Sequence, residues 1–91
     1  MSYQGYVRVI GANENILDVA EASLGHIDHP GHRWGGTLVV WTGGALDGKT
    51  MPVELEVPGS FRASALLVPG PVEGRRRRMA VLGAGGSPFV E

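Results

Sequence analysis

The sequence predicts an all-β fold, a single small domain in which about five or six short strands form an antiparallel meander that closes into a barrel or sandwich. The chain of 91 residues contains 15 glycines and 6 prolines, whose fairly regular spacing marks frequent turns. The segments between these turns are short and apolar, as the strands of a small β domain are. Because an open sheet edge invites pairing with other chains, we expect the strands to close on themselves.

The N-terminal part holds one clear strand and one ambiguous segment. Residues 6–10, Tyr-Val-Arg-Val-Ile, predict a first strand that ends at the turn-forming residues 11–15. Residues 16–24 fit either a helix, with Asn15 as N-cap and Gly25 past its end, or a second strand. We favour the strand, because so short a helix is marginal and the first strand otherwise lacks an antiparallel partner.

The C-terminal part follows a plainer pattern. Residues 37–42 are apolar throughout, which suits a strand in the middle of a sheet, and the Asp-Gly dipeptide within 43–49 signals a turn. In residues 51–57 Val53, Leu55 and Val57 face one way, and two glutamates face the other. Further strands are expected at 61–68 and 76–82, with loops at 58–60 and 69–71 and an apolar anchor at Phe89.

The composition indicates one domain over residues 1–91. With 43% hydrophobic and 19% charged residues, the chain can build a single core. It contains no cysteine, which excludes disulfides and thiolate metal sites, and its net charge of −1 does not favour nucleic acid. The N-terminus lacks a signal-peptide pattern and no apolar run approaches about 18 residues, so we expect a cytoplasmic protein that does not bind membranes.

Residues 25–36 are the most informative segment, because they gather all 3 histidines with Asp28, Arg33 and Trp34 among glycines and a proline. Glycine and proline stop regular structure, so we expect an ordered loop that displays its polar groups. Histidine is the side chain whose ordinary pKa lies nearest neutrality, and such groups on a loop held by a rigid scaffold often carry chemistry.

The first chemical interpretation of this segment is a metal site. The candidate ligands are His26, Asp28, His29 and His32. Zinc or non-haem iron requires such groups to converge within bonds of about 2.0–2.2 Å. The three-residue spacing of the histidines suits a helix, but Pro30 and Gly31 argue against one, so convergence would depend on the geometry of a loop. We therefore predict no metal and no cofactor.

Acid–base catalysis is the second interpretation, with His26, Asp28 and His32 as proton-transfer groups. Trp34 or Trp41 would then shape an apolar cavity for the substrate. The alternative is structural, because histidine and aspartate side chains in turns commonly satisfy nearby backbone groups. We favour the structural role for any one of these residues.

The two tryptophans lie an odd number of positions apart, so an unbroken strand from Trp34 to Trp41 places them on opposite faces. One is expected in the core, whereas the other can wall a pocket or contact a partner chain. Together with Arg33, they are the candidate binding residues.

Arg75–Arg78 is the only run of like charges. Four arginines can bind phosphates, but along a strand they alternate between the two faces. We expect them to be solvated or paired with Glu54, Glu56 or Glu73, and we expect no nucleic-acid binding.

Several motifs together resemble a small actinobacterial domain of unknown function. That domain is found fused behind flavin-containing and Baeyer–Villiger-type monooxygenases and also as a stand-alone protein. The matching stretches are Tyr3-Gln4-Gly5, Gly25-His26-Ile27-Asp28, Gly31-His32-Arg33-Trp34-Gly35, Gly74-Arg75-Arg76-Arg77 and Gly83 through Phe89. Two departures are a shorter segment between Gly25 and Trp34 and a serine, Ser87, in place of the first of two prolines. The resemblance implies a small β domain that is an accessory to oxidative metabolism and does not itself hold flavin.

Two function classes follow from these observations. The favoured hypothesis is a non-catalytic accessory or binding module that self-associates or assembles with a flavin-dependent oxidoreductase. The second is a small biosynthetic enzyme, such as a cyclase, isomerase or hydrolase, that binds a small molecule in a barrel pocket and uses His/Asp acid–base catalysis. A purely structural oligomer subunit is a third interpretation, because residues 37–42 are apolar on both faces. The sequence leaves open whether the protein is an enzyme.

Overall fold

The computed structural model describes residues 2–89, which form antiparallel strands and no helix. The ambiguous segment after residue 15 is a strand, and the predicted all-β fold is confirmed. No apolar helix of the length that a bilayer requires occurs in this part of the chain. The strands are β1 (Tyr3–Ile10), β2 (Ile16–His29), β3 (His32–Trp41), β4 (Met51–Glu56), β5 (Arg62–Glu73) and β6 (Arg76–Ala84).

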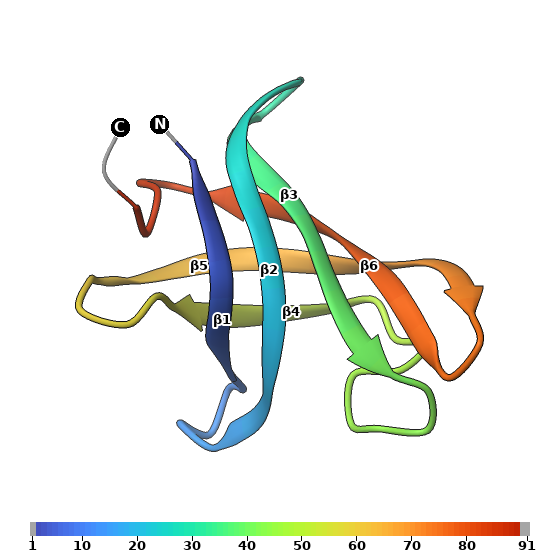
Figure 1. Ribbon diagram of the computed structural model, residues 1–91. Coiled ribbons are helices and arrows are strands. Elements are labelled where there is room, and N and C mark those ends of the chain that lie inside the picture. Colours follow the sequence, from blue (N-terminus) through green and yellow to red (C-terminus); the bar gives the residue numbers. More distant parts are fainter. Residues whose placement is uncertain (1, 90–91) are drawn as a thin grey trace.

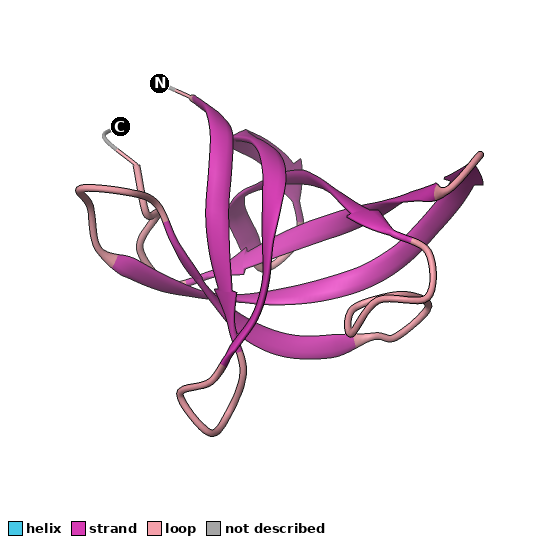
Figure 2. Cartoon of the chain, turned by 60° about the horizontal axis from the view of Figure 1, so that its bottom comes forward, coloured by secondary structure: helices cyan, strands magenta, loops and turns pink. Residues whose placement is uncertain are grey.

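The six strands close into one barrel in the order β1-β2-β3-β6-β5-β4. The chain therefore makes two three-stranded meanders, β1–β3 and β4–β6, and the connection over residues 42–50 carries it from one to the other. Figure 1 shows β1 and β2 crossing β4 and β5 at a steep angle, and Figure 2 shows how the long, bent strands wrap around the interior. The seam between β1 and β4 is short, from Arg8↔Glu56 to Ile10↔Glu54. Closure joins the two edge strands, β1 and β4, to each other at this seam, which limits the sheet edge that another chain could extend.

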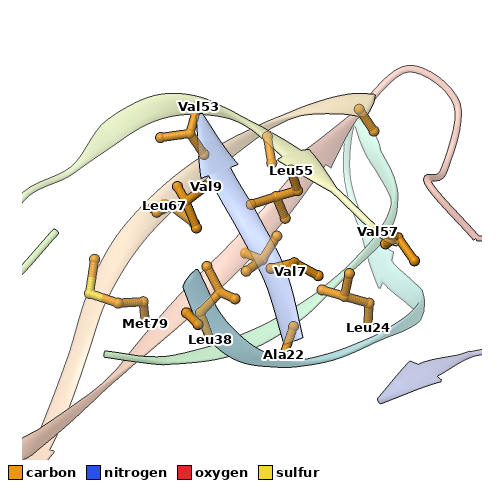
Figure 3. Packing of buried hydrophobic residues seen from close by; sticks show 14 of the residues in the cluster. Val7, Val9, Ala22, Leu24, Leu38, Val53, Leu55, Val57, Leu67 and Met79 are labelled. Atoms are coloured by element: carbon orange, nitrogen blue, oxygen red, sulfur yellow. The ribbon is translucent and has the colours of Figure 1, made fainter. Parts of the chain in front are cut away.

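The interior is filled by apolar side chains from every strand, and no polar residue is buried among those described. Inward and outward residues alternate as strand geometry requires, so that Val53, Leu55 and Val57 are buried as predicted. Figure 3 shows these side chains pointing toward one another across the barrel. The cluster includes Val7, Val9, Ala22, Leu24, Leu38, Val40, Leu67, Met79 and Val81.

Trp34 and Phe89 extend this core near the start of β3. The indole of Trp34 is fully buried, and its ring centre lies 6.2 Å from that of Phe89 in an edge-to-face arrangement. The predicted anchor at Phe89 is thus confirmed. The indole also lies so close to the backbone of Gly83 that no side chain fits at residue 83. Trp34 Nε1 is buried without a hydrogen-bond partner among the described residues.

The segment expected as a loop at residues 25–36 is instead mostly strand. β2 continues to His29 and β3 begins at His32, so only Pro30 and Gly31 form the turn between them. Gly35 and Gly36 mark close backbone contacts rather than turns. A Cβ on Gly36 would overlap the carbonyl oxygen of Ser23 on β2, and one on Gly35 would overlap that of Val81 on β6.

The loop expected at residues 69–71 is also wrong, because here too the glycine marks a close backbone contact. β5 runs through this segment to Glu73, with an irregular register between Pro69 and Val72. A Cβ on Gly70 would overlap the carbonyl oxygen of Arg78 on the neighbouring strand. Proline and glycine sit here at a bulge, where one strand bends against its partner.

Candidate functional site

Two imidazoles face each other at the tip of the β2–β3 hairpin, which projects at the top of Figure 1. His29 and His32 are paired across the two strands, on either side of the Pro30-Gly31 turn. Their ring centres lie 5.2 Å apart, with 54° between the ring planes. His29 is exposed and His32 is half-buried. The hairpin therefore brings together two of the three histidines.

The Nδ1 atom of each ring faces a backbone carbonyl. His32 Nδ1 donates to the Gly83 oxygen over 2.7 Å, and His29 Nδ1 donates to the Pro30 oxygen over 3.2 Å. A carbonyl oxygen only accepts, so the hydrogen must lie on Nδ1 in both rings. These contacts fix the hydrogen positions of the two imidazoles.

Two further polar residues of this segment, His26 and Asp28, lie apart from that pair. His26 is exposed, and its ring meets the ring of Phe89 edge-to-face at 6.4 Å. Asp28 is exposed, and no hydrogen bond or ion pair joins it to any residue between 2 and 89. The three residues predicted to transfer protons, His26, Asp28 and His32, thus share the hairpin but no mutual hydrogen bond. They lie outside the filled barrel interior.

The candidate binding residues divide between three places. Trp34 belongs to the core, whereas Arg33 is exposed and lines an open hollow of about 320 Å³ beside the hairpin tip. Glycines form the rest of that hollow: Gly31, Gly83, Gly85 and Gly86. Trp41 is on the outer surface of the barrel, 57% exposed. The prediction that the two tryptophans face opposite ways is confirmed.

Trp41 belongs to a mixed aromatic and charged surface on the outside of β1, β2, β3 and β6, which we call the Trp41 face. The strand register places one residue from each of these strands side by side in a row across this surface. From β1 to β6 the row consists of Tyr6, Glu21, Val39 and Arg78. Trp41 pairs with Arg76 in the next row. Tyr6 is 61% and Val19 is 53% exposed. The Trp41 face consists of Tyr6, Val19, Glu21, Val39, Trp41, Arg76 and Arg78, and a shallow hollow of about 90 Å³ lies within it.

No ion pair within residues 2–89 neutralises the charged side chains of the Trp41 face, although Asp18 lines the same hollow as Arg76. The guanidinium of Arg76 lies over the Trp41 ring, 4.9 Å from its centre. Neither Arg78 nor Glu21 makes an ion pair with another residue between 2 and 89. Three arginines elsewhere are ion-paired: Arg8 with Glu56, Arg62 with Glu14 and Glu56, and Arg77 with Asp47.

The arginine run alternates between the faces, as expected, but its ion-pair partner was predicted wrongly. Arg77 Nε donates to Asp47 Oδ1 over 2.5 Å, rather than to Glu54, Glu56 or Glu73, while Arg76 and Arg78 face outward. The β3–β4 connection brings Asp47 over β6, which no local pattern reveals. The Gly43 amide and the Arg77 guanidinium hold the pKa of the Asp47 carboxyl below its ordinary value of 3.8. This ion pair fixes the connection and has no substrate-binding geometry.

Sequence reasoning missed a second surface feature, an apolar groove of about 360 Å³ on the outside of β4, β5 and β6. Pro52, Leu66 and Leu82 form its central row, and His32 lies at its border. The available signal was the run Ala-Leu-Leu-Val in residues 65–68, which is apolar on both faces of a strand.

No cluster of three or more His, Asp or Glu side chains suited to a metal ion occurs within residues 2–89. Comparison of the chain with protein-family models, with curated proteins and with solved structures gave no match.

Proposed function

We propose that this protein is a non-catalytic accessory module that works by assembly through the Trp41 face, primarily with a second copy of itself. The observation that carries the proposal is the exposure of Trp41 beside Tyr6 and Val19, on a barrel whose interior is already filled. Contiguous exposed apolar surface on a small protein commonly marks an interaction site. Tryptophan, tyrosine and arginine are the residues that contribute most to protein interfaces.

The charges of this face favour a partner that is a copy of the same chain. Glu21 lies on β2 and Arg78 on β6, on either side of Val39 in the same row. A two-fold axis along β3 would place β2 of one copy opposite β6 of the other. Each Glu21 would then meet the partner's Arg78, and the two Trp41 side chains would approach each other. A surface complementary to itself in this way is what a symmetric dimer requires.

A flavin-dependent oxidoreductase is the second partner that we propose, from the resemblance of the hairpin and C-terminal motifs to the monooxygenase-associated domain. The same surface would serve, and the cytoplasm is the compartment that we propose for the complex. The enzyme alternative is less well supported, because His26, Asp28 and His32 surround no enclosed cavity in the described part of the chain.

Sedimentation velocity tests the self-association directly. The wild-type protein should form dimers at concentrations up to about 100 µM, and Trp41→Ser should weaken the dimer at least about tenfold. Phe61→Ser is the matched control, because Phe61 is 83% exposed but lies outside the Trp41 face. It should leave the dimer unchanged.

Charge reversal tests the orientation of the two copies. Glu21→Arg should weaken the dimer by opposing two arginines, and the double change Glu21→Arg with Arg78→Glu should restore it.

Co-elution and activity measurements test the second partner. A purified flavin-dependent monooxygenase from the same gene neighbourhood should co-elute with the protein, or its turnover should change when the protein is added. The His32→Ala variant should have the same effect on the monooxygenase as the wild-type protein. A wild-type protein that stays monomeric and affects no such enzyme would overturn the proposal.

A further inference from the structure

We propose that His29 and His32 together bind a divalent transition-metal ion, such as Zn²⁺, Ni²⁺ or Cu²⁺, at the tip of the β2–β3 hairpin. This site is independent of the Trp41 face. Imidazole nitrogen is a good ligand for all three ions.

The hydrogen bonds of the two rings leave the correct nitrogen free in each. Because Nδ1 of His29 and of His32 donates to a backbone carbonyl, the neutral ring carries its lone pair on Nε2. Histidines that bind metal ions almost always donate their other ring N–H to a carboxylate, carbonyl or water. The Gly83 and Pro30 carbonyl oxygens supply that support here before any ion is bound.

The separation of the rings suits a shared ion. An imidazole nitrogen binds zinc at about 2.0–2.1 Å, which puts the ring centre roughly 3.2 Å from the metal. When both Nε2 atoms bind the same ion, ring centres 5.2 Å apart subtend roughly the tetrahedral angle at that ion.

The hairpin holds this spacing without depending on a flexible loop. His29 and His32 are paired in the strand register, and a two-residue turn with Gly31 at a φ of 82° joins them. His32 is also tied to β6 through Gly83. His26 does not belong to the site, because its ring lies against Phe89.

The remaining coordination positions are left to water or to a small ligand. No third histidine or carboxylate within residues 2–89 joins the pair in a metal-binding cluster, so the site is open rather than closed.

Calorimetric titration of the untagged 91-residue chain with ZnCl₂ and with NiCl₂ tests the proposal. The wild-type protein should bind one ion, and His29→Ala should weaken binding at least about tenfold, the lower limit for losing even an outer-shell partner. His26→Ala is the matched control and should change the affinity by less than about twofold, because His26 supplies no ligand. MgCl₂ should give no binding, because Mg²⁺ prefers oxygen ligands.

A second measurement does not depend on any variant. In nitrogen-detected NMR of the imidazole rings, Zn²⁺ should shift the Nε2 resonances of His29 and His32 together and leave those of His26 in place. The Trp41→Ser variant should bind the ion with unchanged affinity. Equal effects of His29→Ala and His26→Ala, or a wild-type protein that binds neither ion, would overturn the proposal.

Discussion

Gly83 lies against the indole of Trp34, so closely that a methyl group at residue 83 would stand 2.5 Å from Trp34 Nε1 and nearer still to the ring carbons. The same glycine accepts the hydrogen bond from His32 Nδ1. Gly83 therefore contacts both the core and the hairpin tip: its Cα lies against Trp34, and its carbonyl oxygen binds His32.

Gly83→Ala should be strongly destabilising for this reason. The methyl group cannot be accommodated without moving the indole or the β6 backbone, and such overpacking costs about 1–3 kcal/mol or more. Urea unfolding followed by circular dichroism measures the loss. Gly86→Ala is the control, since a Cβ there meets nothing within 4 Å, and it should stay within about 0.5 kcal/mol of wild type. Equal unfolding midpoints for the two variants would contradict the contact.

Trp34→Ala should lower the free energy of unfolding by about 3–5 kcal/mol, because it leaves a large cavity in the core. Trp34→Phe should cost less, since it keeps an aromatic ring beside Phe89 and removes an N–H that has no partner among the described residues. Trp41→Phe, on the exposed surface, should be nearly neutral. Thermal unfolding of the three variants measures the order of their stabilities. A Trp34→Phe variant as unstable as Trp34→Ala would contradict the prediction.

Asp47→Asn should destabilise the protein at neutral pH and have no effect in strong acid. The Gly43 amide and Arg77 lower the pKa of the Asp47 carboxyl, so its contribution is present above the ordinary value of 3.8. The contribution is lost as the pH falls below that value and the folded-state carboxyl becomes protonated. Urea midpoints measured from neutral pH downward should therefore converge for wild type and variant. Glu73→Gln, an exposed carboxylate without an ion pair in residues 2–89, is the control and should show no such dependence. A constant difference across the pH range would refute the assignment.

Gly31→Ala should cost about 1–2 kcal/mol through backbone strain alone. Residue 31 has a φ of 82°, which disfavours residues with a Cβ, although a Cβ there would meet nothing within 4 Å. Gly31→Asn should cost less, because asparagine tolerates this conformation better. Unfolding midpoints that decrease from wild type to Gly31→Asn to Gly31→Ala would support the turn geometry. The reverse order would exclude it.

The strand pattern was predictable because it depends on local geometry. The alternation in residues 51–57 and the opposite orientation of the two tryptophans follow from the two-residue period of a strand, whatever its neighbours are. The arrangement of the candidate site residues was not predictable in this way. The sequence indicated a loop over residues 25–36, where only Pro30 and Gly31 form a turn. No local pattern indicated that His29 and His32 face each other while the ring of His26 contacts that of Phe89.

The amino-acid sequence by itself determined that this chain forms strands, where most of them lie, and which residues share a face, since these properties arise between neighbours along the chain. Only the tertiary structure decided that β3 lies beside β6, that Asp47 pairs with Arg77, and that Trp34 rather than Trp41 is enclosed. The glycines show why: in residues 25–36 a turn signal and a close contact with another strand look the same. Which of the two a glycine serves depends on a backbone far away in the sequence, such as that of Val81 beside Gly35.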